Sequence, residues 1–224
     1  MKIGLIVATF NELNSLLNNL NLVLNKLSDE PFEVYYLKIN NNDIYIAKSG
    51  IGEISSASLT QFLITKYEVK LIINAGVVGA LKKDLKIKEL CIVKDVVHYD
   101  FDISKIDDVK VGEYEGIGIH IPLNKEYIKL LTSKYKNLNV VSCASGDKFI
   151  EEPNFINYLV TNFDTDICDM ELAGITLVAL KNKVNVISIK AISDSGDSES
   201  YNKNVTEACN ILYSLISDIA TVIK

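Results

Sequence analysis

The stretch Val184–Asp197, VNVISIKAISDSGD, decides the fold class of this chain of 224 residues. Its first part is mainly apolar and rich in β-branched residues, which predicts a buried strand over 184–192. From Ser193 and Asp194 onward the residues are hydroxyls, carboxylates and a glycine. In an open α/β sheet, ligands bind at the carboxyl ends of the strands. We therefore expect a functional site at Ser193 and Asp194.

Strand and helix patterns alternate along the rest of the chain. Apolar runs predict further buried strands over 1–8, 69–74, 89–98 and 139–144. A hairpin is indicated where 32–39 and 43–48 flank three asparagines. Helical spacing predicts helices over 11–28, from Gly52 to about Tyr67, and over 124–136, 171–182 and 203–223. These patterns indicate an α/β fold with a central mixed, mostly parallel sheet flanked by helices, in a single domain over 1–224.

Small and polar residues follow several of the predicted strands. Sheet topology gathers such strand ends on one edge, so together they predict a small-molecule site. Each segment alone has an ordinary structural explanation, such as a tight turn or a helix cap. The segments are Ala8–Glu12, Ser49–Gly52, Asn74–Gly79, Ser145–Ile150, Asp169–Glu171 and Ser193–Asp197.

The composition excludes several classes of function. The net charge is -6 and there is no basic run, which argues against nucleic acid and anionic membrane surfaces as partners. All of the 23 Lys+Arg residues are lysines, so bidentate arginine clamps on phosphate or carboxylate are absent. No segment reaches the roughly 18 to 20 apolar residues of a membrane span.

Cysteine usage and the N-terminus predict the compartment. The 4 cysteines are widely spaced, with neither a CxxC motif nor Cys/His metal spacing. They fit reduced thiols of a cytoplasmic protein. The N-terminal MKIGLIVATFNEL has too short an apolar stretch for a signal peptide. We expect a soluble cytoplasmic protein that needs no metal and no cofactor.

Segments along nearly the whole chain, from Lys2 to Asp197, resemble one enzyme family. In order they are KIGLIVATFNE, KSGIGEISSA, INAGVVGAL, SGDKFI, CDMELAGI and KAISDSGD. They resemble the 5'-methylthioadenosine/S-adenosylhomocysteine nucleosidases of the nucleoside phosphorylase superfamily. The resemblance implies that superfamily's fold and hydrolysis of the N-glycosidic bond of either nucleoside, or of 5'-deoxyadenosine, with release of adenine. It also implies a place in methionine salvage.

The reaction defines what the catalytic residues must do. Cleaving a glycosidic bond to adenine needs a proton for the leaving base and a nucleophile on the opposite face of the sugar. The resemblance implies that Asp194 protonates adenine N7, with Ser193 steadying its carboxyl, and that a partly dry pocket raises the pKa of Asp194. Glu12 matches the glutamate that activates the attacking water. From the residues alone, Glu12 fits a solvated first-turn helix residue.

The resemblance also implies a set of substrate-binding residues. Glu171 would accept hydrogen bonds from the ribose 2'- and 3'-hydroxyls, and its position at a helix start would favour the ionised form. Met170 would pack against the sugar or base, and Ile51 would lie beside the sugar. Phe149 would stack on adenine, and the backbone at Ile150 would contact the purine edge. From the residues alone, Met170, Ile51 and Phe149 are equally typical of core.

Three positions depart from the family pattern. Val77 stands where a serine is usual, and Lys190 stands where an arginine is usual. Both belong to the substrate-binding set, near the water or the ribose. Asp169 precedes the methionine where a glutamate is more common. Val77 lacks a side-chain hydrogen bond and Lys190 lacks arginine's planar fork, so the departures bear on rate and substrate preference.

Two other functions stay open. A purine nucleoside phosphorylase would use phosphate in place of water, but it would do so without arginines and with Glu12 where the anion enters. A non-catalytic nucleoside-binding protein of the same fold is the second alternative. A Ser/His/Asp hydrolase is disfavoured because there is no GxSxG motif. The resemblance further implies a homodimer, in which the irregular segment 99–122 lends apolar groups such as Ile117, Ile119 and Ile121 to the neighbour's 5'-substituent pocket.

Overall fold

Strand β10 (Asn185–Asp194) lies at the centre of the computed structural model, which describes residues 1–20 and 25–223. It pairs in parallel with β5 (Leu71–Ala80) along its whole length and antiparallel with β6 (Leu90–His98). The predicted strand over 184–192 is therefore confirmed, and it continues two residues further than predicted, to Asp194. Nine of its ten residues are buried, and the polar Ser188 and Lys190 are among them, because both faces of the strand are covered.

The central strands close into a ring. Strand β6 pairs in parallel with β8 (Leu138–Ser145), and β8 pairs in parallel with β9 (Ile167–Asp169). Strand β9 then pairs antiparallel with β5, which also pairs with β10. The expected mixed α/β sheet is confirmed. Antiparallel pairing extends beyond the early hairpin, because both ring closures, β9 to β5 and β6 to β10, are antiparallel.

From β5 the sheet continues outward beyond the ring. Its order is β1 (Lys2–Val7), β4 (Asn42–Lys48), β3 (Val34–Ile39) and β2 (Asn25–Ser28). The predicted hairpin is confirmed as the antiparallel pair of β3 and β4, with Asn40 in the left-handed conformation at the turn. A short strand, β7 (Ile121–Pro122), pairs with β6 at the end of the irregular segment 99–122.

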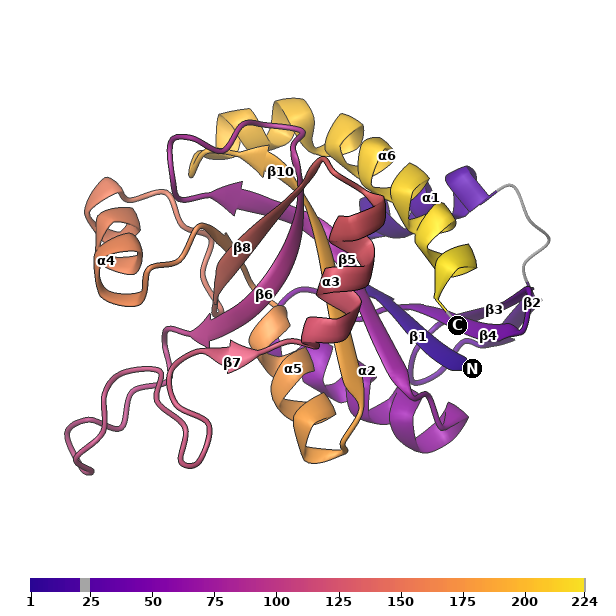
Figure 1. Ribbon diagram of the computed structural model, residues 1–224, viewed down its shortest axis with the longest axis horizontal. Helices are drawn as coiled ribbons and strands as arrows, with labels where there is room; N and C mark the ends of the chain where they lie inside the picture. Colours follow the sequence, from indigo (N-terminus) through magenta and orange to yellow (C-terminus); the bar gives the residue numbers. More distant parts are fainter. Residues whose placement is uncertain (21–24, 224) are drawn as a thin grey trace.

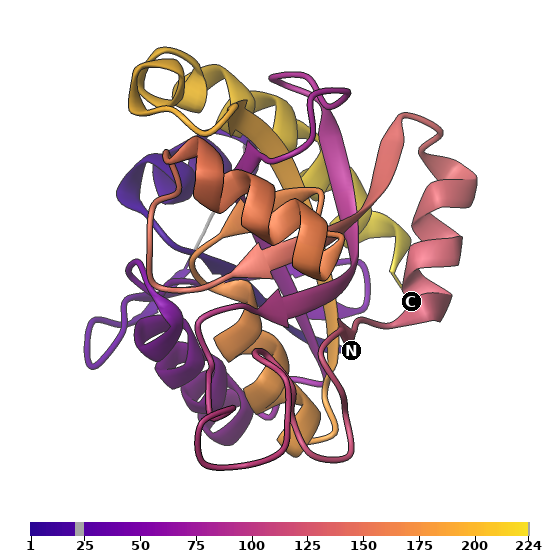
Figure 2. The ribbon, with the colours of Figure 1, turned by 90° about the vertical axis from the view of Figure 1, so that its left-hand side faces the viewer.

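Helices cover both faces of the sheet, as Figure 1 shows. Helix α1 (Phe10–Leu20) and the long α6 (Ser198–Val222) pack against one another on one face. Helices α2 (Glu53–Tyr67) and α5 (Leu172–Lys181) pack together on the other. Helix α3 (Lys125–Lys134) packs beside β6, and α4 (Pro153–Phe163) lies over the far end of the ring, near the irregular segment (Figure 2). Among the described residues, no helix is long and apolar enough to cross a membrane.

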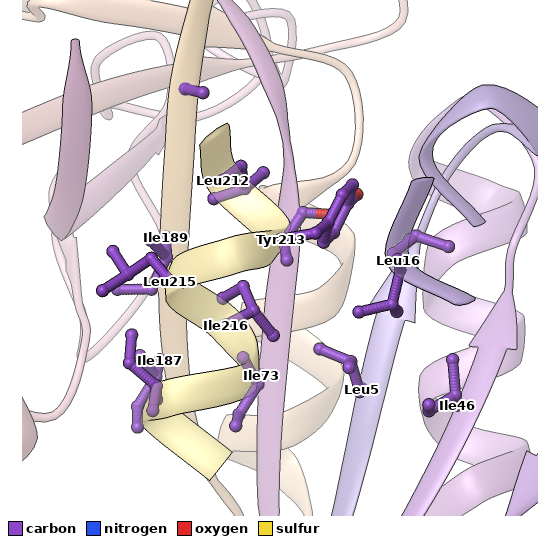
Figure 3. Packing of buried hydrophobic residues seen from close by; sticks show 14 of the residues in the cluster. Leu5, Leu16, Ile46, Ile73, Ile187, Ile189, Leu212, Tyr213, Leu215 and Ile216 are labelled. Atoms are coloured by element: carbon purple, nitrogen blue, oxygen red, sulfur yellow. The ribbon is translucent and has the colours of Figure 1, made fainter. Parts of the chain in front are cut away.

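The face covered by α6 shows how the core is built (Figure 3). Ile73 and Ile189 project from neighbouring strands and lie among Leu212 and Ile216 of the helix, all of them fully or nearly fully buried. Full burial of one such side chain contributes about 1.5–3 kcal/mol to stability. Tyr213 is completely buried among them, and its hydroxyl donates to the carbonyl of Ala75 at 3.2 Å. This packing holds α6 rigidly above the ends of β5 and β10.

The helix predicted over 11–28 is only partly correct. Helix α1 ends at Leu20, and the predicted helical positions 21–24 lie outside the described residues. Residues 25–28 form strand β2, paired antiparallel with β3, so helix is wrong there. The leucine spacing is helical, but frequent asparagines weaken helix propensity and the open edge of β3 offers backbone hydrogen bonds instead.

Other boundaries also differ from expectation. Strand β5 does not end at Asn74 but continues through the small residues to Ala80, because two parallel neighbours and β9 supply hydrogen bonds along its whole length. Helix α4 and strand β9 were not predicted. Strand β9 has three residues, too few for a periodic signal. The last helix begins at Ser198, earlier than predicted, because the Asp197 side chain accepts from Ser200 N–H and caps it.

Candidate active site

A cavity of about 390 Å³ opens where β1, β5, β9 and β10 end. This is the edge at which the polar strand ends were expected to meet. Nearly all of the predicted site residues line it: Glu12, Ile51, Val77, Phe149, Ile150, Met170, Glu171, Ser193 and Asp194. Lys190 is absent from the lining. Among the described residues, no group of three His, Cys, Asp or Glu side chains is arranged to hold a metal ion.

Glu12 is buried in the first turn of α1, with 3% of its surface exposed. Its Oε2 accepts from the N–H groups of Ala8 (2.9 Å) and Thr9 (2.8 Å) and from the Thr9 hydroxyl (3.1 Å), and its Oε1 accepts from Val77 N–H (3.0 Å). These donors hold the carboxylate in one orientation. A carboxylate fixed at the cavity wall is suited to accept a proton from water.

Thr9 was not predicted as a site residue, although the sequence carries a signal for it. Thr9 and Glu12 form a capping box: the Thr9 Oγ1 accepts from Glu12 N–H at 3.3 Å while Glu12 accepts from Thr9 N–H. The motif T-x-x-E at the start of a helix is therefore a structural cap here, and the same carboxylate faces the cavity. Glu12 combines the ordinary helix role with the chemical one.

Gly76 makes room for this carboxylate. A Cβ at position 76 would lie 2.7 Å from Glu12 Oε1 and 3.8 Å from the ammonium nitrogen of Lys190. Only glycine leaves the space that the carboxylate occupies. The first glycine of the AGVVG segment, Gly76, is thus required because the Glu12 side chain lies directly against the backbone of β5. The backbone N–H of Val77, rather than its side chain, supplies the hydrogen bond to Glu12.

Asp194 is 2% exposed at the end of β10. Its Oδ1 accepts from Gly196 N–H at 2.9 Å, and its Oδ2 lies 2.9 Å from the Ser193 hydroxyl. Burial raises the pKa of the Asp194 carboxyl above its usual value, and the hydrogen bonds from Gly196 and Ser193 only partly oppose that shift. A carboxyl with a raised pKa at a cavity wall is suited to deliver a proton.

The Ser193 hydroxyl can serve both protonation states of Asp194. It also lies 3.2 Å from the carbonyl oxygen of Val78. When Asp194 is ionised, the hydroxyl donates to it; when Asp194 is protonated, the hydroxyl can accept from the carboxyl and donate to that carbonyl. A shift of register between Ile192 and Asp194 in the pairing with β5 makes this contact feasible, because Ser193 is an extra residue there.

Glu171 occupies the residue just before α5. Its Oε1 accepts from Gly52 N–H at 3.2 Å, and its Oε2 accepts from Met170 N–H at 3.3 Å. The helix start was expected to keep Glu171 ionised, but the structure shows the opposite tendency. Burial, reinforced by the charges of Asp169 and Glu12, raises the pKa of the Glu171 carboxyl, and Lys190 opposes them only in part.

The apolar wall of the cavity is partly exposed. Phe149 is 42% exposed and its ring meets that of Tyr201 edge-to-face, with the centroids 5.9 Å apart. Ile51 is 59% exposed at the start of α2. Tyr201 comes from α6 and was not predicted, because nothing in the local sequence distinguishes it from a core aromatic of an amphipathic helix. Together these residues form a surface on which a flat aromatic ligand can stack.

Lys190 lies behind the cavity wall rather than in it. Its side chain is 2% exposed, and its ammonium makes a 2.6 Å ion pair with Asp169 Oδ2. Two of the three positions at which the chain departs from the family pattern, 169 and 190, are therefore partners of one another. The expected contact of Lys190 with a ligand stays a prediction, since its ammonium is paired with Asp169, which does line the cavity.

The irregular segment 99–122 is tied to the rest of the chain near the cavity. His98 Nδ1 lies 2.7 Å from the Tyr114 hydroxyl, and Asp100 accepts from Asp147 N–H at 3.0 Å. Of the three isoleucines offered as contacts to a neighbouring subunit, Ile121 is fully buried in the core of its own chain. That expectation is wrong for Ile121, because its strand β7 pairs with β6 and turns it inward.

Comparison with known proteins identifies the family and agrees with the fold. The model of the phosphorylase superfamily matches residues 2–220. The 5'-methylthioadenosine/S-adenosylhomocysteine nucleosidase of Buchnera aphidicola subsp. Baizongia pistaciae is 34% identical over 203 residues, covering 88% of this chain and 79% of that protein. The nucleosidase of that name from Helicobacter pylori has the same fold, with a TM-score of 0.93 at 24% identity over 100% of this chain and 99% of the other. Futalosine hydrolase of the same organism matches with a TM-score of 0.90 at 26% identity, over 98% and 97%. The chain therefore belongs to the phosphorylase superfamily and, within it, to the family of 5'-methylthioadenosine/S-adenosylhomocysteine nucleosidases.

Proposed function

We propose that this protein hydrolyses the N-glycosidic bond of 5'-methylthioadenosine and S-adenosylhomocysteine and releases adenine. One observation carries the proposal: the same cavity holds a carboxyl group fixed by four hydrogen-bond donors, Glu12, and a carboxyl whose pKa burial raises, Asp194. Two carboxyl groups in contrasting environments are the usual division of labour between base and acid. The matching relatives carry the name of this activity.

In the proposed hydrolysis, one carboxyl group takes up a proton and the other gives one to the leaving base. Glu12 takes one proton from a water molecule, whose oxygen forms a bond to C1' of the ribose. The bond between C1' and N9 of adenine breaks, and its electron pair goes to the base. Asp194 gives its proton to N7, so adenine leaves neutral. The products are adenine and a 5-substituted ribose, and Ser193 can support Asp194 before and after the transfer, since its hydroxyl has a second acceptor in Val78.

Binding of the nucleoside uses the remaining wall residues. Glu171 accepts from the ribose hydroxyls, and their approach supplies donors that favour its ionised form. Phe149 stacks on the adenine, with Tyr201 bracing the ring, and the backbone at Ile150 meets the purine edge. Met170 and Ile51 pack against the sugar. Val77 and Lys190 act on the site indirectly. The N–H of Val77 donates to Glu12, and the ammonium of Lys190 donates to Asp169.

Water is favoured over phosphate as the nucleophile. The chain has no arginine, and the ammonium of Lys190 is already paired with Asp169. Glu12 places a negative charge where phosphate would have to enter. A phosphorylase and a non-catalytic binding protein are therefore both disfavoured, the latter because the acid and the base are present in one cavity.

Incubation of the purified protein with 5'-methylthioadenosine, with and without phosphate, tests the proposal. Chromatography should show adenine and 5-methylthioribose at the same rate in both conditions. A ribose-1-phosphate product that forms only with phosphate would contradict the hydrolase assignment. Absence of adenine in both conditions, with binding of the nucleoside retained, would favour a non-catalytic protein.

We further propose a cytoplasmic homodimer that acts as one unit over residues 1–224 in methionine salvage. Buried, unpaired thiols support a reducing compartment: Cys91, Cys143, Cys168 and Cys209. Exposed isoleucines on the start of α2 and on segment 99–122 support an interface beside the cavity: Ile54 (80% exposed) and Ile106 (87%). Sedimentation analysis of the purified protein checks the oligomeric state.

A further inference from the structure

Behind the cavity wall, one serine hydroxyl lies between two carboxyl groups. The Ser145 Oγ is 2.5 Å from Glu53 Oε1 and 2.6 Å from Asp169 Oδ1, and it accepts from Ala173 N–H at 3.1 Å. Ser145 is completely buried, and each of the two carboxyl residues is 7% exposed. Water therefore has little access to this contact.

A count of hydrogens shows that a proton is missing from this arrangement. A serine hydroxyl carries one hydrogen and can donate to one of its two carboxyl neighbours only. The other carboxyl, if ionised, would face the oxygen of Ser145 without a hydrogen between them. Two oxygens at 2.5–2.6 Å in a buried site need a donor in between. One of Glu53 and Asp169 must therefore be protonated.

The donors around each carboxyl decide which one holds the proton. Asp169 accepts from the Lys190 ammonium at 2.6 Å and from a backbone N–H at the start of α5 at 3.3 Å. Glu53 accepts from one backbone N–H, that of Gly174, through its Oε2. Within the described part of the chain, its Oε1 has Ser145 as its one hydrogen-bond partner. The ammonium stabilises a charge on Asp169, whereas Glu53 has no cation beside it among the residues that the structure describes.

We propose that Glu53 holds a proton and donates it in a hydrogen bond to Ser145, which in turn donates to an ionised Asp169 paired with Lys190. In this arrangement the Ser145 oxygen accepts two hydrogen bonds and donates one, so its capacity is fully used. Glu53 is a positioning residue that acts on the cavity through Ser145 and Asp169.

The electrostatic surroundings agree with this assignment. Burial, and after it the charge of Asp169, raises the pKa of the Glu53 carboxyl to about 7. The other titratable and charged groups around it are Asp147 after β8, Glu171 before α5, Tyr99 and Tyr114 of segment 99–122, and, beyond Asp169, Lys190 of β10. Asp147 accepts from Glu53 N–H at 2.7 Å and adds to the negative field that favours a neutral Glu53.

The chain of hydrogen bonds ends at the cavity. Asp169 Oδ1 also accepts from Leu172 N–H, so Asp169 holds the start of α5. The cavity residues Met170 and Glu171 lie between Asp169 and this helix. The charge of Lys190 partly opposes the rise that burial causes in the pKa of Glu171. If Glu53 is neutral, Asp169 can stay ionised and accept hydrogen bonds from both Leu172 N–H and the Lys190 ammonium. The consequence for turnover rests on the proposed function, but the proton on Glu53 does not.

The test compares Glu53→Gln with the wild type and with Glu115→Gln, the same change at an exposed glutamate. An amide reproduces the protonated carboxyl, since its oxygen can accept from Gly174 and its NH₂ can donate to Ser145. A glutamate with a raised pKa stabilises the fold fully below its unfolded value, near 4.5, and loses that contribution as the pH rises through about 7. Thermal unfolding without substrate should therefore show Glu53→Gln gaining in Tm over the wild type between pH 5 and pH 8, with no such gain for Glu115→Gln.

Each outcome decides the proposal. An equal Tm difference at both pH values would overturn it, and so would a Glu53→Gln chain that fails to fold, because the amide supplies both hydrogen bonds. The second measurement is turnover, with Glu53→Leu as a variant that supplies neither hydrogen bond. The kcat/KM of Glu53→Gln should exceed that of Glu53→Leu by about 5-fold to 150-fold, which corresponds to one lost buried hydrogen bond. If the protein releases no adenine, the stability profiles still test the proton on Glu53.

Discussion

Replacement of Asp194 by asparagine separates its chemical role from its structural one. The amide oxygen can accept from Gly196 N–H, as Oδ1 does now at 2.9 Å. Its NH₂ can donate to the Ser193 hydroxyl, which then donates to the Val78 carbonyl at 3.2 Å. Every polar group therefore keeps a partner and the fold should be unaffected. The amide has no acidic proton for the leaving base, so turnover should fall by about 10²- to 10⁴-fold.

The stability of Asp194→Asn relative to the wild type should also change with pH in a predictable direction. Burial raises the pKa of Asp194, so its contribution to stability is complete below the unfolded value, about 3.9, and is lost as the pH rises through the folded value. Asparagine does not titrate. The Tm of Asp194→Asn should therefore equal or exceed that of the wild type at neutral pH, and the difference should shrink in acid.

The assay is chromatographic measurement of adenine under saturating 5'-methylthioadenosine, with thermal unfolding as the folding check. Asp197→Asn is the matched control, because Asp197 undergoes the same change three residues away, caps α6 through Ser200 N–H, and is a smaller cause than burial of the raised pKa of Asp194. The control should stay within about threefold of wild type, since it removes no proton donor from the cavity. A folded Asp194→Asn that also stays within about threefold would refute Asp194 as the general acid.

Further substitutions test the other walls of the cavity. Glu12→Gln should bind a stable nucleoside analogue with little change and lose about 10²- to 10⁴-fold in kcat, because the amide cannot take a proton from water; loss of binding with turnover preserved would show that the role is misassigned. Glu171→Gln should impair both KM and kcat, since Glu171 holds the ribose throughout the reaction, and an effect on kcat alone would contradict this. Gly76→Ala should lower kcat by about 10²-fold without unfolding the chain, because its Cβ would lie 2.7 Å from Glu12 Oε1 and displace that carboxylate; unchanged kinetics would show that Glu12 need not be fixed.

Local patterns predicted the strands that build the site. The apolar run before Ser193 indicates a strand buried on both faces, and β10 is such a strand. The polar residues after the runs predicted a common edge, and the cavity lies there. Alternation of strands and helices is enough for this, since parallel strands place their carboxyl ends together. The antiparallel closure of the ring by β9 left no such signal, because three residues show no period.

Side-chain partners depended on the tertiary structure. Lys190 is an isolated cation in the sequence, and its neutralisation by Asp169 follows from the pairing of β10, β5 and β9, which brings positions 21 residues apart to 2.6 Å. The expected ionisation of Glu171 at a helix start was outweighed by burial, which no helix-end pattern reports. No sequence pattern marked Glu53 as a functional residue, because its protonation depends on the neighbouring Ser145 and Asp169 side chains, which are distant in the sequence.

The sequence by itself determined most of the strands and helices, the edge that carries the site and, by resemblance, the chemistry expected there. These follow from hydrophobic period and from short polar motifs, which are local properties of the chain. Only the tertiary structure decided the orientation and charge of the carboxyl groups. The extra residue in β10 brings Ser193 against Asp194, and the missing side chain at Gly76 admits Glu12. Protonation is set by burial and by charges within a few ångströms, and those distances exist only once the ring of strands has closed.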